Sequence, residues 1–176
     1  MRFAAPARKE LKIKTIMNLV GPLSNPADAD FQIIGVWEDK FCPIVARAAK
    51  LLGVKKVMVV HGLDGIDEIS ISDKSRIVII DENNSESDFI FNPEDEGIPM
   101  FKLSDLAGGS PKENAQMARD ILAGNGPEAV RVACCLNAGG ALMVSGIVST
   151  IKEGYDLAEK ALNDGSVDKK VQELTA

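Results

Sequence analysis

Residues 57–69 read Val57-Met-Val-Val-His-Gly-Leu-Asp-Gly-Ile-Asp-Glu-Ile69, an apolar run followed by a glycine-broken segment that carries three acids. The run from Lys55 to Val60 is short, apolar and rich in β-branched residues, which predicts a buried strand that Gly62 ends. In open α/β sheets, ligands bind outside the carboxyl ends of the strands. The stretch therefore predicts a strand that delivers a loop of carboxylates to a ligand-binding edge.

The three acids of this loop, Asp64, Asp67 and Glu68, are candidate ligands for a hard cation. Mg²⁺ prefers oxygen ligands and is often shared between one or two carboxylates and the phosphates of a substrate. Turn chemistry alone also concentrates Asp in loops, so a solvated acid loop is the alternative. The alternation over Ile69–Ile71 predicts a second strand beginning near Ile66. Strand neighbours point to opposite faces, so Asp67 and Glu68 can share a site only from a loop or a strand mouth.

The order of the remaining segments predicts an α/β fold, with a mixed or parallel sheet flanked by helices. At 176 residues the chain is long enough for one compact unit, spanning residues 1–176, with a substantial core. Strands are expected at 31–37, 55–60, 69–71, 76–80 and 89–91. Turn-rich loops are expected at 21–26, 81–88 and 92–97. Helices are expected at 2–12, 42–52, 110–123, 130–148 and 152–163, the last one extended by residues 167–174.

Composition narrows the classes of function. A net charge of −6 argues against nucleic-acid binding, which requires a basic face. The sequence has no apolar run of transmembrane length and no signal peptide, so no membrane partner is expected and a cytoplasmic location is the default. The vicinal pair Cys134–Cys135 does not have zinc-ligand spacing, and buried, reduced thiols are expected.

Other candidate sites have simpler structural interpretations. Gly108–Ser110 precedes a helix as an anion cradle would, but Ser110 and Glu113 form a capping box without any ligand. The glycines of Asn137–Ala141 suit either close approach to a ligand or tight packing, which is favoured. His61 is the only histidine, and without a nucleophile at a recognisable spacing no triad and no catalytic side chain is predicted. Arg8 is either a carboxylate clamp or an ordinary surface arginine.

The order of five motifs is more specific than any one of them. They are Arg2-Phe-Ala-Ala-Pro-Ala-Arg-Lys-Glu-Leu11, Thr15-Ile-Met-Asn-Leu-Val-Gly-Pro-Leu-Ser-Asn-Pro-Ala27, His61-Gly-Leu-Asp-Gly-Ile-Asp-Glu-Ile-Ser70, Gly108-Gly109 with Glu113-Asn-Ala115, and Leu136-Asn-Ala-Gly-Gly-Ala141. Together they resemble the anthranilate phosphoribosyltransferase family over essentially the whole chain. This family transfers phosphoribosyl from phosphoribosyl pyrophosphate (PRPP) to the amine of anthranilate, with Mg²⁺, in tryptophan biosynthesis.

The resemblance implies roles for five residues. Asp67 and Glu68 resemble the acid pair that binds the Mg²⁺ associated with the leaving pyrophosphate. Arg8 resembles the arginine that contacts the anthranilate carboxylate, and Gly21 and Pro22 resemble the loop that lines the anthranilate channel. The implied fold is part of a phosphoribosyltransferase/nucleoside-phosphorylase-like α/β domain.

The chain also departs from this family. A full member is about twice as long and begins with a helical domain and a glycine-rich loop that grips phosphate, neither of which has a counterpart here. The chain therefore resembles a C-terminal half, which we expect to be inactive alone and to work as a homo-oligomer or with a separate N-terminal half. The alternatives are a non-catalytic interaction module that pairs with such a half, and a related phosphoribosyltransferase or phosphorylase that uses another nucleophile.

Overall fold

A four-stranded mixed sheet forms the centre of the molecule. In the computed structural model, which describes Glu10 and residues 15–175, its strands lie in the order β1-β2-β3-β4. β1 pairs with β2 in parallel, whereas β3 runs antiparallel to both β2 and β4. The strands are β1 (Phe31–Gly35), β2 (Lys56–Gly62), β3 (Ser75–Ile80) and β4 (Glu86–Phe91).

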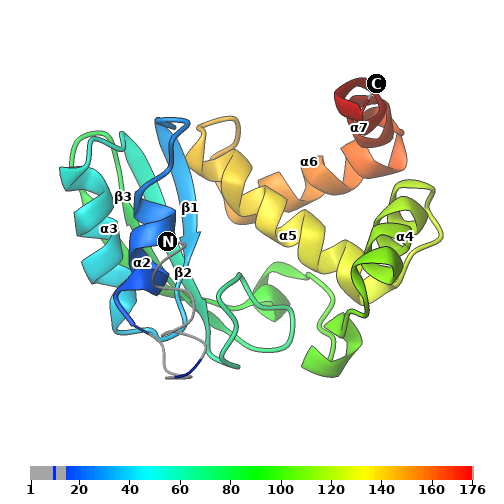
Figure 1. Ribbon diagram of the computed structural model, residues 1–176, viewed down its shortest axis with the longest axis horizontal. Helices are drawn as coiled ribbons and strands as arrows, with labels where there is room; N and C mark the ends of the chain where they lie inside the picture. Colours follow the sequence, from blue (N-terminus) through cyan, green and yellow to red (C-terminus); the bar gives the residue numbers. More distant parts are fainter. Residues whose placement is uncertain (1–9, 11–14, 176) are drawn as a thin grey trace.

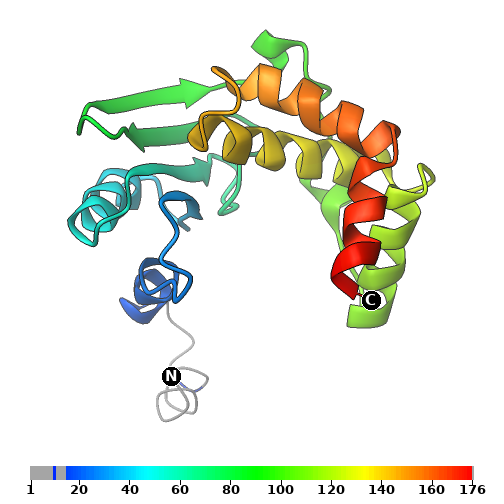
Figure 2. The same cartoon turned by 90° about the horizontal axis from the view of Figure 1, so that it is seen from above.

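Helices cover both faces of this sheet (Figures 1 and 2). α2 (Met17–Leu23) and α3 (Phe41–Leu51) lie on one face, and α5 (Glu128–Val144) lies on the other with α6 (Ile151–Asn163) packed along it. Because both faces of β2 are covered, its residues form a continuous apolar run rather than an alternating one. This explains why the decisive stretch of sequence has so few polar side chains before His61.

Successive residues of β2 serve two separate cores. Val57 and Val59 face α3, where they pack with Val45 and Ala49, whereas Met58 and Val60 belong to the cluster built around α5. This division follows from the two-residue period of a strand. The sheet is therefore stabilised by apolar burial from both sides.

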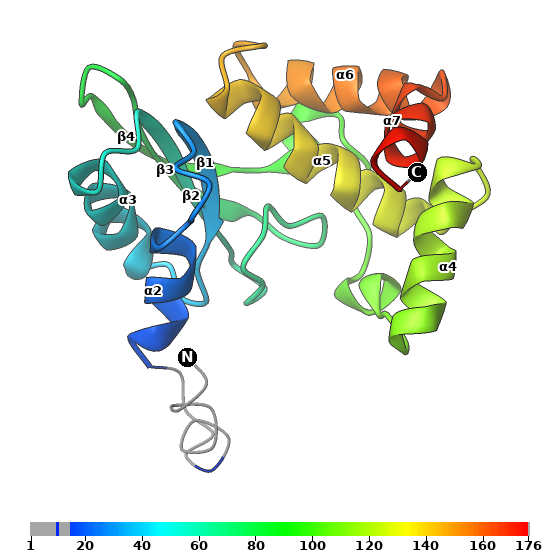
Figure 3. The same cartoon turned by 45° about the horizontal axis from the view of Figure 1, so that its top comes forward.

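The remaining helices extend away from the sheet (Figure 3). α4 (Pro111–Leu122) and α7 (Ser166–Thr175) lie beside each other at the far ends of α5 and α6. Two short 3₁₀ helices, η1 (Pro93–Glu96) and η2 (Leu103–Leu106), lead from β4 to α4. The four helices α4 to α7 surround an apolar groove of about 930 Å³.

Several sequence expectations need correction. Ile69–Ile71 is not a strand but part of the loop between β2 and β3, because β3 occupies the pairing position next to β2. Gly21 and Pro22 lie in the last turn of α2 rather than in a loop, and the helix ends one residue after the proline.

The other differences concern element boundaries. β4 begins at Glu86, so the hairpin tip is shorter than expected. α5 spans Glu128–Val144 rather than 130–148. Residues 166–175 form a separate helix, because Gly165 adopts a φ of 80° and turns the chain after α6. The expected strands at β1, β2 and β3 and the helices α3, α4 and α6 are confirmed. The helix expected at 2–12 lies largely outside the described residues.

Candidate functional site

The acid loop, defined here as residues 63–74, joins β2 to β3 at the carboxyl ends of the parallel strands β1 and β2. It crosses the end of β1 at very short range. A Cβ atom on Gly35 would lie only 1.6 Å from the carbonyl oxygen of Asp67, so only glycine can occupy the end of this strand. Gly35 was not identified from the sequence, although a glycine inside the strand expected at 31–37 was the available signal.

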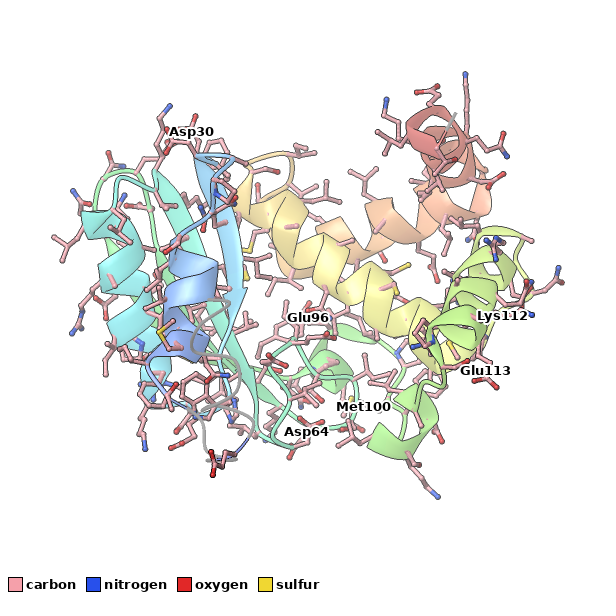
Figure 4. The ribbon with its side chains drawn as sticks, in the orientation of Figure 1. Asp30, Asp64, Glu96, Met100, Lys112 and Glu113 are labelled. Carbon is pink, nitrogen blue, oxygen red and sulfur yellow. The ribbon has the colours of Figure 1, made fainter. Side chains whose placement is uncertain are left out.

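A hydrogen-bond network centred on Asp64 folds the acid loop back on itself. Figure 4 labels Asp64. The Asp64 carboxylate accepts a hydrogen bond of 2.6 Å from the Ser70 hydroxyl and another from the Ser72 hydroxyl. Burial works to raise the pKa of Asp64, but the hydrogen bonds from Ser70 and Ser72 outweigh it and the pKa lies below its ordinary value. Ser70 is fully buried, and its own N–H donates to the Ser75 hydroxyl at 2.8 Å.

This network changes the interpretation of the three acids. Asp64 was expected to join Asp67 and Glu68 in a cation site, but its carboxylate is occupied within the loop. Within the described residues, no group of three or more His, Cys, Asp or Glu side chains is placed to hold a metal ion. The predicted three-carboxylate site is therefore wrong, and Asp64 shapes the loop instead.

Asp67 and Glu68 are exposed and line the same cleft. Because residues 66–69 form a loop rather than a strand, neighbouring side chains are not forced to opposite faces. The cleft has a volume of about 750 Å³. Its other walls come from the acid loop itself, β1, β2, α5 and η2 with the residue after it, through Ile33, Gly35, Val60, Ile66, Leu103, Leu106, Ala107, Val130, Ala133, Cys134 and Asn137. The pair is the acidic part of an otherwise largely apolar cavity.

Asp67 and Glu68 suit an Mg²⁺ ion that is shared with a ligand, rather than one bound by the protein alone. A cation bound by the protein alone would need more oxygen ligands than two neighbouring carboxylates provide. Mg²⁺ commonly retains waters and is shared between one or two carboxylates and substrate phosphates, which matches an exposed acid pair in an open cleft. The residues therefore fit a cation that arrives with a phosphorylated ligand.

The substrate residues expected from the resemblance lie apart from the acid pair. Gly21 and Pro22 line a second cavity, of about 460 Å³, along β1. Ile33 borders both this cavity and the acid cleft, so both reach the middle of β1. Arg8 lies outside the described residues.

The structural interpretations of the other candidates hold. Ser110 caps α4 reciprocally with Glu113, and Asn114 Oδ1 accepts from the Gly109 N–H at 2.7 Å, so the chain's own side chains occupy these amides. Figure 4 shows Glu113 in this first turn. His61 is buried, with Nδ1 2.8 Å from the Val36 carbonyl oxygen. Cys42 and Cys135 are buried as expected, but Cys134 is exposed and lies on the cleft wall.

The glycines of α5 serve tight packing. A Cβ on Gly139 would lie 2.6 Å from the Tyr155 nitrogen of α6, and a Cβ on Gly154 would lie 2.4 Å from the Gly139 carbonyl oxygen. On the other side of α5, a Cβ on Gly140 would lie 2.8 Å from Ile69 Cδ1. The two neighbouring glycines thus bring α5 close to α6 and to the acid loop at once.

None of the helices in the described part of the chain combines the length and the apolar character needed to cross a membrane. The longest, α5, has 17 residues.

Comparisons with known proteins agree with this geometry. The chain is 39% identical over 177 residues to anthranilate phosphoribosyltransferase from Moorella thermoacetica, covering 100% of this chain and 51% of that protein. Its fold matches the crystal structure of anthranilate phosphoribosyltransferase from Thermus thermophilus with a TM-score of 0.81 and 36% identity, covering 94% of this chain and 48% of the other.

A third match is anthranilate phosphoribosyltransferase from Saccharomyces cerevisiae in complex with PRPP and Mg, with a TM-score of 0.82 and 28% identity. It covers 96% of this chain and 48% of the yeast chain. The chain thus spans about half the length of the relatives it matches. The resemblance found in the sequence motifs is confirmed. The model of the glycosyl transferase family, a/b domain, matches residues 1–167, and the chain belongs to this family.

Proposed function

We propose that the chain supplies the metal and pyrophosphate side of an anthranilate phosphoribosyltransferase site. The observation that supports this most directly is the placement of Asp67 and Glu68 in one cleft, at the carboxyl ends of β1 and β2. The reaction would transfer phosphoribosyl from PRPP to the amine of anthranilate in tryptophan biosynthesis, in the cytoplasm. The yeast relative, whose structure is in complex with PRPP and Mg, adds support from a similar fold.

The proposed chemistry requires no covalent nucleophile from the chain. The bond between ribose C1 and the pyrophosphate oxygen breaks, a bond from C1 to the amine nitrogen forms, and the amine loses a proton. Asp67 and Glu68 would hold the cation, which when bound would supply positive charge near the departing pyrophosphate. The apolar wall of Val60, Ile66 and Leu106 would limit access of water to the sugar.

The anthranilate side of the site belongs, in this proposal, to the cavity along β1. Gly21 and Pro22 line it, and Ile33 borders both it and the acid cleft. Arg8 would bind the anthranilate carboxylate by two parallel hydrogen bonds. An aromatic amine in the β1 cavity and a phosphorylated sugar in the acid cleft would meet near Ile33.

A second proposed function is association with a segment equivalent to the other half of the relatives. The groove among α4 to α7 supports it, because it is almost entirely apolar and stays uncovered in the described chain. We therefore expect little or no turnover from the chain alone. Co-expression with residues equivalent to the unmatched half of the Moorella thermoacetica protein should give a complex and the fluorescence of phosphoribosyl-anthranilate.

The metal role can be tested without turnover. Mn²⁺ binding, followed by electron paramagnetic resonance, should require inorganic pyrophosphate and should be lost in the double variant Asp67→Asn, Glu68→Gln. Asp73→Asn is the matched control, because Asp73 is an exposed acid in the same loop. Equal binding by the double variant and the control would show that the acid pair does not hold the cation.

A further inference from the structure

Asn137, on α5, makes two reciprocal hydrogen bonds with the backbone of Ile69. The Ile69 N–H donates to Asn137 Oδ1 at 2.9 Å, and Asn137 Nδ2 donates to the Ile69 carbonyl oxygen at 3.1 Å. The side-chain amide therefore imitates the edge of a neighbouring strand. This contact joins residues 68 positions apart and replaces the strand pairing that residues 69–71 lack.

The amide of Asn137 is committed to this contact and has little capacity left for a ligand. Its second Nδ2 hydrogen is donated to the Ala133 carbonyl oxygen at 3.0 Å, one turn earlier on α5. Both donors of the amide are thus used, and one lone pair of Oδ1 is used. The bond to Ala133 also fixes the rotamer of the side chain on a rigid helix. Asn137 lines the acid cleft, but two of its three hydrogen bonds go to the acid loop and the third to its own helix.

The position of this contact relates it to the acid pair. The Ile69 N–H belongs to the peptide bond that joins Glu68 to Ile69, so the contact restricts the backbone of Glu68 itself. Ile69 is 1% exposed, and its side chain packs against Gly140 of the same helix. The Asp67 carbonyl oxygen, in the peptide bond that joins Asp67 to Glu68, lies against Gly35 of β1. The backbone of Glu68 is therefore held at both ends, by one point on the sheet and one on α5, and Asp67 carries the point on the sheet.

We propose that Asn137 is a positioning residue, which holds the backbone of the acid loop so that Asp67 and Glu68 face the cleft together. This inference rests on the proposed metal role of the pair. Groups that orient metal ligands typically contribute about 10- to 100-fold to metal affinity. Without such support, an exposed loop would adopt several conformations in the free protein. The ligand would then have to order the loop, and this cost lowers the affinity.

The test uses the full chain and two measurements. In Asn137→Leu, which keeps a similar size and removes all three hydrogen bonds, the Ile69 amide should exchange with solvent at least about 10-fold faster, while Val59 in β2 is unchanged. Mn²⁺ affinity in the presence of pyrophosphate should fall by about 10-fold or more. Asn163→Leu, the same substitution at an exposed position of α6, is the matched control and should change neither quantity.

A second variant guards against failure of the first to fold. Asn137→Asp replaces the donor by a second, charged acceptor that would face the carbonyl oxygens of Ile69 and Ala133, and this repulsion should open the contact, so the variant should show the same two changes. Faster exchange at Ile69 with unchanged Mn²⁺ affinity would overturn the positioning role and leave the metal site intact. Unchanged exchange at Ile69 would overturn the contact itself. If the unsubstituted chain binds no Mn²⁺ with pyrophosphate, the proposed metal role fails, and the positioning role fails with it.

Discussion

The sheet region and the distal helices differ in how their apolar residues are used. β2 and β3 are buried on both faces, between α3 on one side and α5 on the other. α7 has no buried residue among those described, and α4 has one, Ile121. Both distal helices nevertheless have amphipathic sequences, and α4 has a complete capping box. Local helix signals and tertiary burial are therefore separate properties here, because α4 and α7 have helical sequences without a closed core.

The largest effect is expected where the two regions are joined, at the crossing of α5 and α6. Gly139→Ala should destabilise the chain by about 1–3 kcal/mol, because the new methyl group would clash with the backbone nitrogen of Tyr155. Helix propensity alone would favour alanine by about 1 kcal/mol, so a decrease in the free energy of unfolding would identify the clash. Urea unfolding measures the change.

The neighbouring position on α5 provides the control for this substitution. Ala138 is exposed, and Ala138→Gly should cost about 1 kcal/mol through propensity alone. A stabilising effect of Gly139→Ala would mean that α5 and α6 do not cross as closely as the structure shows.

A smaller effect is expected from removing α7. Because no described residue of α7 is buried, a chain ending at Gly165 should lose less than about 1 kcal/mol of stability and keep the amide protection of β2 and β3. Amide hydrogen exchange followed by NMR compares both regions in one experiment. A general loss of protection in the sheet would show that the distal helices contribute to the main core.

The smallest effect concerns one carboxylate in each region. The pKa values of Asp64 and Glu113 are both lowered, in Asp64 by serine hydroxyls that outweigh its burial and in Glu113 by its capping bonds with Ser110. A lowered folded-state pKa means that the stabilisation is present above the ordinary pKa and is lost as the pH falls through the folded value. Asp64→Asn should therefore be less stable than the original chain at pH 7, and the difference should close as the pH falls below the ordinary value of 3.8.

Glu113→Gln is the matched variant in the distal region. Glu113 is fully exposed, so its substitution should give a smaller difference with the same dependence on pH. Urea unfolding midpoints of both variants, measured from pH 7 down to a pH below the ordinary carboxyl pKa, would show which substitution has the larger effect on stability. A larger effect at Glu113 would contradict the view that the distal helices are only weakly coupled to the stability of the whole.

Much of this arrangement could be predicted from local sequence. The apolar run before His61 predicts β2, and Ser110 with Glu113 predicts the start of α4, because these signals lie within one element. The course of the acid loop could not be predicted, because it depends on Asn137 and Gly35, which are distant in sequence from the acids. Alternating isoleucine and serine at 69–72 satisfies a strand pattern, but Ser70 and Ser72 use their hydroxyls to bind Asp64 instead. The pairing of Asp67 and Glu68 in one cleft rests on this non-local support.

The adjacent glycines at 139 and 140 fix how closely α5 approaches its neighbours. Gly139 faces α6 and Gly140, about 100° further round the helix, faces Ile69 of the acid loop, so added bulk toward α6 would shift the helix relative to the acid loop. A substitution that relaxes the α5–α6 contact would therefore change the position of the acid loop at the cleft, although no substituted atom touches the cleft. Any redesign of the α6 surface for a new partner would have to preserve the close packing of α5 and α6 in order to leave the acid pair undisturbed.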